Sequence, residues 1–197
     1  MARLPAVLGT DDLPLAELCA ARIDGDLFAI DEGWAPIDEP DLPSLRAAVV
    51  ALRVSRSLII ERLSAAWVHD AVDTPPRTAQ FCVPHGSRIA AIADRRVAVR
   101  EVVLTDDEFV ELGGVRCTTP ARTAFDLLRE TSVTDADSER IVTRLLTSRP
   151  RLEDQIRERF DRARRMPHRT RALARLGHAV EAMPQSSTVS AQPSLTR

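Results

Sequence analysis

Few side chains in this sequence have the type and spacing that catalysis needs. Gly86-Ser87, with Asp94 seven residues on, raises a nucleotidyltransferase hypothesis, in which a Gly-Ser turn holds the triphosphate and paired aspartates hold Mg²⁺. Asp94 is followed by Arg95-Arg96, so the second aspartate of that metal site is missing. His69 and His85 lie at no metal-ligand spacing from another histidine, a cysteine or paired carboxylates. We therefore expect a protein that performs no catalysis and holds no metal or cofactor.

The composition excludes further kinds of chemistry. All 27 residues counted as lysine or arginine are arginine, which excludes Schiff-base enzymes, phosphate-loop NTPases and nucleases that pair two carboxylates with a lysine. This usage is typical of a GC-rich bacterial genome. The cysteines Cys19, Cys82 and Cys117 are odd in number and far apart, so they form neither a disulfide framework nor a metal knuckle. We expect all three to be small, buried apolar residues.

The balance of apolar and charged residues predicts a globular, cytoplasmic protein. The chain is 44% hydrophobic and 28% charged, and it has no run near the ~20 apolar residues that span a bilayer, so no membrane partner is expected. The net charge of −2 conceals a gradient. Residues 1–50 hold three arginines against ten carboxylates, whereas residues 139–182 hold twelve against six. The basic C-terminal helices are therefore the expected surface for an acidic partner or nucleic acid.

The first predicted elements are a short helix and a hairpin. The expected buried face of the helix consists of Leu15, Leu18 and Ile23. Gly25 is placed to end this helix. The apolar runs 27–30 and 34–37 flank Asp31-Glu32-Gly33, a composition suited to a tight turn. A helix followed by a hairpin is the second half of a winged helix-turn-helix, so we predict a reduced, winged-helix-like unit over residues 1–42.

After an acidic linker at residues 38–43, the pattern predicts an α+β domain over residues 44–182. The expected buried face of its first helical stretch consists of Ile59, Leu63, Ala66 and Trp67. The prolines within residues 73–77 end that stretch. Three strand-like runs follow, at residues 78–84, 97–104 and 114–119.

The best-specified local structure is the helix that begins after the third strand. Thr119 is suited to cap it, and Pro120 suits its first position because a proline lacks the N–H that would be unpaired there. Its expected apolar stripe consists of Ala124, Leu127 and Leu128. Later helices have expected faces at Leu152, Ile156 and Phe160, and, after a break at Pro167, at Leu173, Leu176 and Val180. Residues 183–197 have no core pattern and are expected to form a disordered tail.

Two sets of residues on these helices are candidates for contact with a partner. Arg122 and Asp126 are spaced i,i+4, and Asp126 and Arg129 i,i+3, which predicts an ion-pair ladder. With Thr123, these residues either orient the helix against the preceding strand or present Arg122 to a partner. The second set is Arg162, Arg164, Arg165, Arg169 and Arg171, within an arginine-rich region that also includes Arg157, Arg159 and Arg175. That region is either a solvated, salt-bridged face or a surface for an acidic toxin or nucleic acid.

The stretch GVRCTTPARTAFDLLRE, residues 114–130, resembles the G-x-R-[VC]-T-[ST]-P-x-R-T-x-x-D-L segment of AbiEi-type antitoxins. The helix AAWVHDA, the strand TAQFCVP and the run REVVLTDDEFVELGG extend the resemblance over residues 44–130. In that family an N-terminal winged helix-turn-helix binds the operon's own promoter DNA, and a C-terminal domain counteracts a nucleotidyltransferase-like toxin. The resemblance therefore implies a type IV antitoxin.

The N-terminus departs from the family pattern in its length and its charge. Gly25, Leu27, Gly33 and Trp34 fit the family's wing, but too few residues precede them for a three-helix DNA reader. Acidic residues also dominate where arginine or lysine normally meets phosphate. Two alternatives to the antitoxin role stay open at this point, a DNA-binding transcriptional autoregulator and an orphan nucleotidyltransferase.

Overall fold

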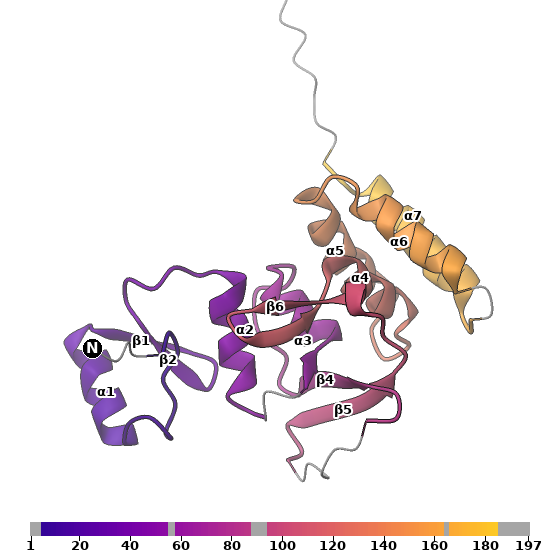
Figure 1. The fold of residues 1–197 in the computed structure, drawn as a ribbon. Helices are drawn as coiled ribbons and strands as arrows, with labels where there is room; N and C mark the ends of the chain where they lie inside the picture. The colour runs from indigo at the N-terminus through magenta and orange to yellow at the C-terminus, as the bar shows by residue number, and fades with distance from the viewer. Residues whose placement is uncertain (1–4, 55–57, 88–93, 164–165, 185–197) are drawn as a thin grey trace, which may run out of the picture.

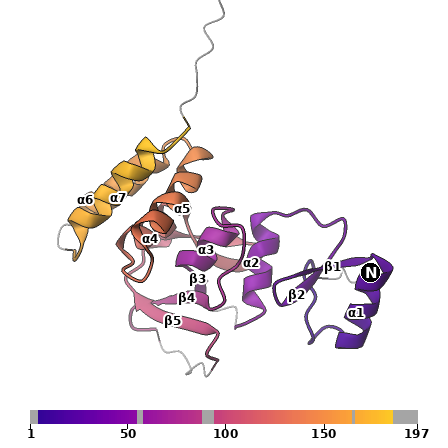
Figure 2. The same ribbon diagram turned by 180° about the vertical axis from the view of Figure 1, so that it is seen from behind.

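The computed structural model describes residues 5–54, 58–87, 94–163 and 166–184, and shows an α+β fold. Helix α1 and the hairpin β1–β2 lie at one end, and helices α6 and α7 at the other (Figures 1 and 2). A five-stranded sheet and helices α2 to α5 lie between them. Within the described ranges, no helix is long and apolar enough to cross a membrane.

The N-terminal elements follow the predicted order. Helix α1 (Leu15–Asp24) ends at Gly25, which adopts φ 86°, and β1 (Leu27–Ile30) pairs antiparallel with β2 (Gly33–Pro36). The predicted glycine end and the hairpin are thus confirmed. The predicted buried face of α1 is wrong, because only its central leucine, Leu18, is buried. Leu15 and Ile23 are 55% and 85% exposed, since they face away from the side of α1 that packs on the fold.

The central sheet has the order β5-β4-β3-β7-β6 and mixes parallel with antiparallel pairs. After α2 (Pro43–Ala51), the chain forms β3 (Ile59–Ile60), α3 (Arg62–Val68), β4 (Ala79–Pro84) and β5 (Val97–Val102). A 3₁₀ turn η1 (Asp106–Glu108), β6 (Phe109–Leu112) and β7 (Val115–Thr118) follow. Strand β3 pairs parallel with β7 and antiparallel with β4, so it occupies the middle of the sheet.

One helical prediction is wrong at this central strand. Ile59 belongs to β3 and not to the helix that contains Trp67, which begins at Arg62. Both residues of β3, Ile59 and Ile60, are fully buried. A strand covered on both faces shows no polar alternation, and its apolar run therefore also fits a helical face.

The C-terminal half consists of α4 (Pro120–Arg129), α5 (Asp135–Thr147), α6 (Leu152–Arg162) and α7 (Arg169–Glu181). The predicted start of α4 is confirmed, since Pro120 is its first residue and the Thr119 side chain accepts a hydrogen bond from the Arg122 N–H. Confirmed buried positions are Ala124, Leu127, Leu128, Leu152, Ile156, Phe160 and Leu176, with Leu173 and Val180 partly buried. These side chains form one apolar cluster among the four helices.

A second apolar cluster lies around the sheet, α2 and α3, and it includes residues of the N-terminal unit. Val7 and Ala35 pack there with Trp67 and Phe81. The proposed division into residues 1–42, 44–182 and 183–197 stays a prediction, and residues 185–197 lie outside the described part of the chain. Of the three cysteines, Cys82 and Cys117 are buried as predicted, but the same prediction is wrong for Cys19, which is exposed on α1.

Candidate functional site

The motif residues of α4 face the interior of the fold. Arg122, Thr123 and Asp126 are each at most 4% exposed. The Nε of Arg122 donates to the Asp126 carboxylate at 2.8 Å, which confirms the predicted i,i+4 pair. The hydroxyls of Thr123 and Thr118 lie 2.8 Å apart and join α4 to β7. These contacts fix the helix against the strand that precedes it, and Arg122 has little surface left for a partner.

Arg122 also reaches across to the turn before β6. Its Nη1 donates to Glu108 at 2.8 Å and to the carbonyl of Val103 at 3.0 Å. Glu108 in turn accepts from the backbone N–H of Thr105 at 3.0 Å and closes the η1 turn. A guanidinium that joins two carboxylates and a carbonyl uses the planar fork of arginine fully, so a lysine here would not be equivalent.

The ion pairs continue on the other side of Asp126. Arg100 of β5 lies 3.1 Å from Asp126 and 2.7 Å from Glu61, which follows β3 and is fully buried. Arg62 lies 2.9 Å from Glu61 and 2.7 Å from Glu130 at the end of α4. The result is one chain of alternating charges that connects β3, β5, α3, α4 and η1.

The pKa values show how the ion-pair partners offset the effect of burial on these charged side chains. Burial raises the pKa of Glu61, and the hydrogen bond from Arg100 opposes that rise. Burial opposes the charge of Arg100, but Glu61 and Asp126 together raise its pKa. At Glu130, burial is outweighed by hydrogen bonds from Arg62 and Ser132, which lower the pKa to about 2. Charged groups of this kind persist inside a protein only when partners and hydrogen bonds satisfy them.

The predicted pair of Asp126 with Arg129 does not form, and Arg129 lies over the ring of Phe125 instead, 4.9 Å from its centroid. Arg159 of α6 lies over the same ring at 4.6 Å and is ion-paired to Glu108. Two guanidinium groups thus lie over the ring of Phe125, the position in which an aromatic ring attracts a cation.

Both interpretations of the arginine-rich region, a solvated face or a surface for a partner, predict that Arg175 is exposed, and for this residue that is wrong. It is 2% exposed and donates at 2.8 to 3.0 Å to three carbonyls at and after the end of α4, those of Leu128, Glu130 and Val133. Asp135 accepts a further bond at 2.7 Å. The buried residues of α7 are Ala172, Arg175, Leu176 and Ala179. Arg175 therefore occupies the apolar stripe at i,i+3 and i,i+4 spacing, and this position was the available signal for burial.

The other arginines of α6 and α7 form an exposed surface in which each has an acidic neighbour. The ion pairs are Arg157–Glu153, Arg162–Glu158, Arg169–Asp161 and Arg171–Asp135. Of the proposed contact residues, Arg162 lies at the end of α6, and Arg169 and Arg171 lie in the first turn of α7. Two residues turn an α-helix by about 200°, so Arg169 and Arg171 point to different sides of α7 and pair with Asp161 of α6 and Asp135 of α5. Arg164 and Arg165 lie outside the described residues.

The turn of the hairpin β1–β2 is attached to the rest of the fold. Asp31 accepts two hydrogen bonds from Arg53, at 2.8 and 2.9 Å, and Glu32 pairs with Arg96 at 2.5 Å. Asp31 also adopts φ 51° to close the turn. A hairpin tip held in this way does not project freely toward a DNA groove.

The residues of the nucleotidyltransferase hypothesis do not form a metal site. The carboxylate of Asp94 accepts from the backbone N–H of Arg96 at 2.8 Å and lies 3.5 Å from the Arg96 guanidinium. Gly86 and Ser87 are described, but residues 88–93 between them and Asp94 are not. Throughout the described ranges, no three histidine, cysteine or carboxylate side chains are grouped so as to hold a metal ion.

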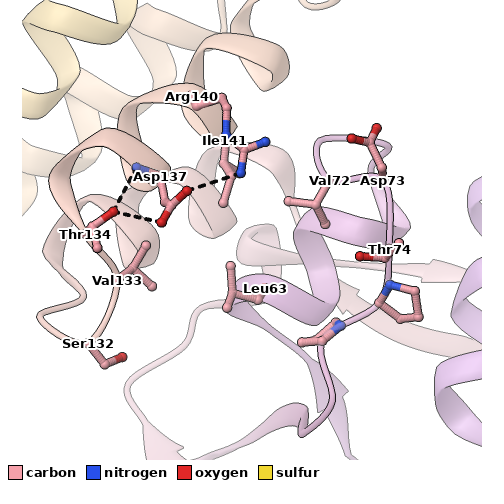
Figure 3. A pocket seen from close by; sticks show the side chains of 12 residues that line it. Leu63, Val72, Asp73, Thr74, Ser132, Val133, Thr134, Asp137, Arg140 and Ile141 are labelled. Atoms are coloured by element: carbon pink, nitrogen blue, oxygen red, sulfur yellow. Dashed lines mark hydrogen bonds and ion pairs between the residues drawn. The ribbon is translucent and has the colours of Figure 1, made fainter.

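A cavity of about 410 Å³ lies between α5 and the segment after α3 (Figure 3). Leu63, Val72, Val133 and Ile141 supply its apolar lining. The polar groups at its edge bind one another, since Asp137 accepts from Thr134 at 2.8 Å and from Arg140 at 3.3 Å. This cavity therefore offers apolar surface but little charge to a ligand.

Most of these contacts lie in the part of the chain that matches a known protein family. The model of the AbiEi antitoxin C-terminal domain matches residues 59–181. Among solved structures, the chain is similar to the RV2827C protein from Mycobacterium tuberculosis at 18% identity and a TM-score of 0.36, over 88% of this chain and 76% of that one. A search of curated proteins finds no match.

Proposed function

This chain belongs to the AbiEi antitoxin C-terminal domain family, and from that membership we propose that it is the antitoxin of a type IV toxin–antitoxin system. Its target in this proposal is a nucleotidyltransferase-like toxin, which it counteracts stoichiometrically in the cytoplasm and without turnover. The observation that carries the proposal is the family match over residues 59–181, which includes all of β3 to α7 and the ion-pair chain around α4.

In this proposal the buried and exposed arginines have different roles. Arg122, Thr123 and Asp126 keep α4 in place and act on the toxin only through the fold. Arg162, Arg169 and Arg171 supply the contacts, because each can exchange an internal carboxylate for one on a partner. Arg162 and Arg171 are exposed, whereas Arg169 is partly buried and also donates to the Phe160 carbonyl. Ion pairs at the surface contribute little to stability, so the exchange costs little.

The experiment is growth of a host that expresses the open reading frame adjoining this gene, with and without this protein. We expect toxicity from the neighbour and rescue by the wild type. The surface variant carries Arg162→Ala, Arg169→Ala and Arg171→Ala, and the control carries Arg140→Ala on α5, where an exposed arginine is also ion-paired to a carboxylate of its own helix. Rescue lost only in the surface variant, at equal protein level, supports the proposed contact. A toxic neighbour that the wild type fails to counteract would refute the antitoxin proposal.

The alternative role, as a promoter-binding autoregulator, has a separate test. The hairpin tip is bound by Arg53 and Arg96, and Asp24 and Asp26, which precede β1 at the other end of the hairpin, are exposed. Both features oppose close approach to phosphates. A shift of the promoter fragment that weakens steeply with salt would favour the alternative role.

A further inference from the structure

A cavity of about 560 Å³ opens beside the end of β5, between α4 and α6, and arginines dominate its lining. They are Arg100, Arg122, Arg129, Arg159 and Arg162, against the two carboxylates Glu108 and Asp126. A second cavity of about 280 Å³ shares Arg100, Asp126 and Arg129 with the first. Together the two are within the range of small-molecule sites, about 300–1,000 Å³.

Three of these arginines have a buried N–H group without a hydrogen-bond acceptor among the described residues, although Nη2 of Arg100 still lies 3.1 Å from the Asp126 carboxylate. The Nε–H groups of Arg129 and Arg159 are buried and have no acceptor among the described residues. Arg159 still has Glu108 as an ion-pair partner, whereas Arg129 has no carboxylate within ion-pair distance in the described ranges. Buried donors without acceptors are uncommon in native proteins, and each calls for a partner. An anion in the cavity would provide acceptors to both.

The local electrostatics agree with this reading. Burial lowers the pKa of Arg129, and the nearby charges of Arg100 and Arg122 lower it further, against the opposite effect of Asp126. Burial likewise lowers the pKa of Arg159, Asp107 opposes that effect, and Arg162 adds to it. The guanidinium groups thus repel one another across the cavity, and a bound anion would relieve that repulsion.

We propose that this cavity binds the phosphate groups of a nucleoside triphosphate. Guanidinium forks bind phosphate oxygens in pairs, and a triphosphate offers enough oxygens for Arg129, Arg159 and the exposed Arg162 together. The remaining lining includes Val102, Val103, Met166 and Pro167, which supply apolar surface for a sugar and base.

The geometry favours a small ligand over a long polyanion. The Arg122 side chain is 5% exposed and that of Arg159 21%, so this part of the cationic lining lies inside a recess, with the exposed Arg162 at its edge. A terminal phosphate can enter such a recess, whereas the phosphates of a polynucleotide are flanked on both sides by sugars.

The test is isothermal titration of the purified full chain with ATP. Arg129→Gln is the informative variant, because it removes a guanidinium that leaves no carboxylate unpaired. Arg157→Gln is the matched control, since Arg157 lies outside the lining and is held only by Glu153 at the surface. We expect the wild type to bind ATP, Arg129→Gln to raise the Kd by about tenfold or more, and Arg157→Gln to leave it unchanged. Adenosine, which lacks phosphates, should not bind, and inorganic triphosphate should compete.

Three results would overturn the proposal. The first is no heat of binding to the wild type at millimolar ATP. The second is equal weakening in Arg129→Gln and Arg157→Gln, which would indicate general attraction to positive charge. The third is a single-stranded oligonucleotide that binds more tightly than ATP and loses its affinity in Arg129→Gln, which would assign the cavity to nucleic acid. The measurement needs no toxin, so its failure is distinguishable from failure of the growth rescue.

Discussion

Removal of the Arg122 side chain is expected to destabilise the fold strongly. Its guanidinium is buried and contacts Asp126, Glu108 and the Val103 carbonyl at 2.8 to 3.0 Å. In Arg122→Ala, both carboxylates lose a charge partner and the carbonyl loses a donor, while an alanine at this helical position causes no backbone strain.

The expected magnitude follows from what remains around the two carboxylates. Breaking a buried ion pair by removing one partner costs about 3–5 kcal/mol, because it leaves an uncompensated charge. Here Asp126 keeps Arg100 at 3.1 Å, and Glu108 keeps Arg159. We therefore expect a loss near the lower end, about 3 kcal/mol, from a total free energy of unfolding of about 5–15 kcal/mol.

The assay is urea unfolding at pH 7, followed by far-UV circular dichroism. The control is Arg140→Ala, because Arg140 lies at the surface 3.3 Å from Asp137 and its pair should contribute less than about 0.5 kcal/mol. Arg122→Lys should fall between the wild type and Arg122→Ala, since one ammonium cannot reproduce a fork that spans two carboxylates. A loss in Arg122→Ala no larger than that in Arg140→Ala, at unchanged m-value, would refute the stabilising role of the buried ion pairs.

The structure also predicts how substitutions at His69, Arg175 and Gly25 change the stability of the fold. Burial lowers the pKa of His69 from 6.5 to about 4, so the unfolded state takes up a proton first as the pH falls. The free energy of unfolding should then decrease between pH 6.5 and 4 by up to about 3 kcal/mol, as measured by urea unfolding at several pH values. His69→Gln should remove this pH dependence, whereas His85→Gln, at an exposed site, should leave it unchanged. Arg175→Met should lower the free energy of unfolding in urea by about 3 kcal/mol, because it leaves three carbonyls without a donor. Arg171→Met should have a much smaller effect, because Arg171 is exposed. Equal losses in the two variants would contradict the burial of Arg175. Gly25→Ala should lower the free energy of unfolding by about 1 kcal/mol and so lower the Tm. The added Cβ would have nothing within 4 Å, but a backbone φ of 86° is strained for any residue with a side chain. An unchanged Tm would contradict this.

The sequence predicts best those elements whose stability is local. The start of α4 is specified by Thr119 and Pro120, which act on neighbouring backbone groups, and the end of α1 by Gly25. The pair Arg122–Asp126 is predictable for the same reason, because one helical turn brings the two side chains together whatever surrounds them. The family resemblance rests on this segment, and the family match includes it.

Contacts between residues distant in the sequence could not be predicted in this way. Strand β3 has two residues, Ile59 and Ile60, and it is a strand only because β4 and β7 pair with it from either side. Glu61 meets Arg100 thirty-nine residues away, and their spacing in the sequence carries no trace of this contact. The apolar stripe of α7 is a sequence signal for the burial of Arg175, but no such signal marks Arg122 and Glu61, whose burial depends on contacts with distant elements.

The distribution of charge around α4 distinguishes groups that stabilise the fold from a group available to a ligand. Eight side chains alternate in sign along the ion-pair chain, namely Glu130, Arg62, Glu61, Arg100, Asp126, Arg122, Glu108 and Arg159. Their charges cancel, as burial requires. Arg129 is adjacent to this balanced set and adds a positive charge without a carboxylate within ion-pair distance in the described ranges. The Phe125 ring and the more distant Asp126 offset its desolvation only in part, since its pKa is still lowered. An excess of one charge is expected at a site where a ligand of opposite charge binds. For this reason the binding test substitutes Arg129 and not the more central Arg122.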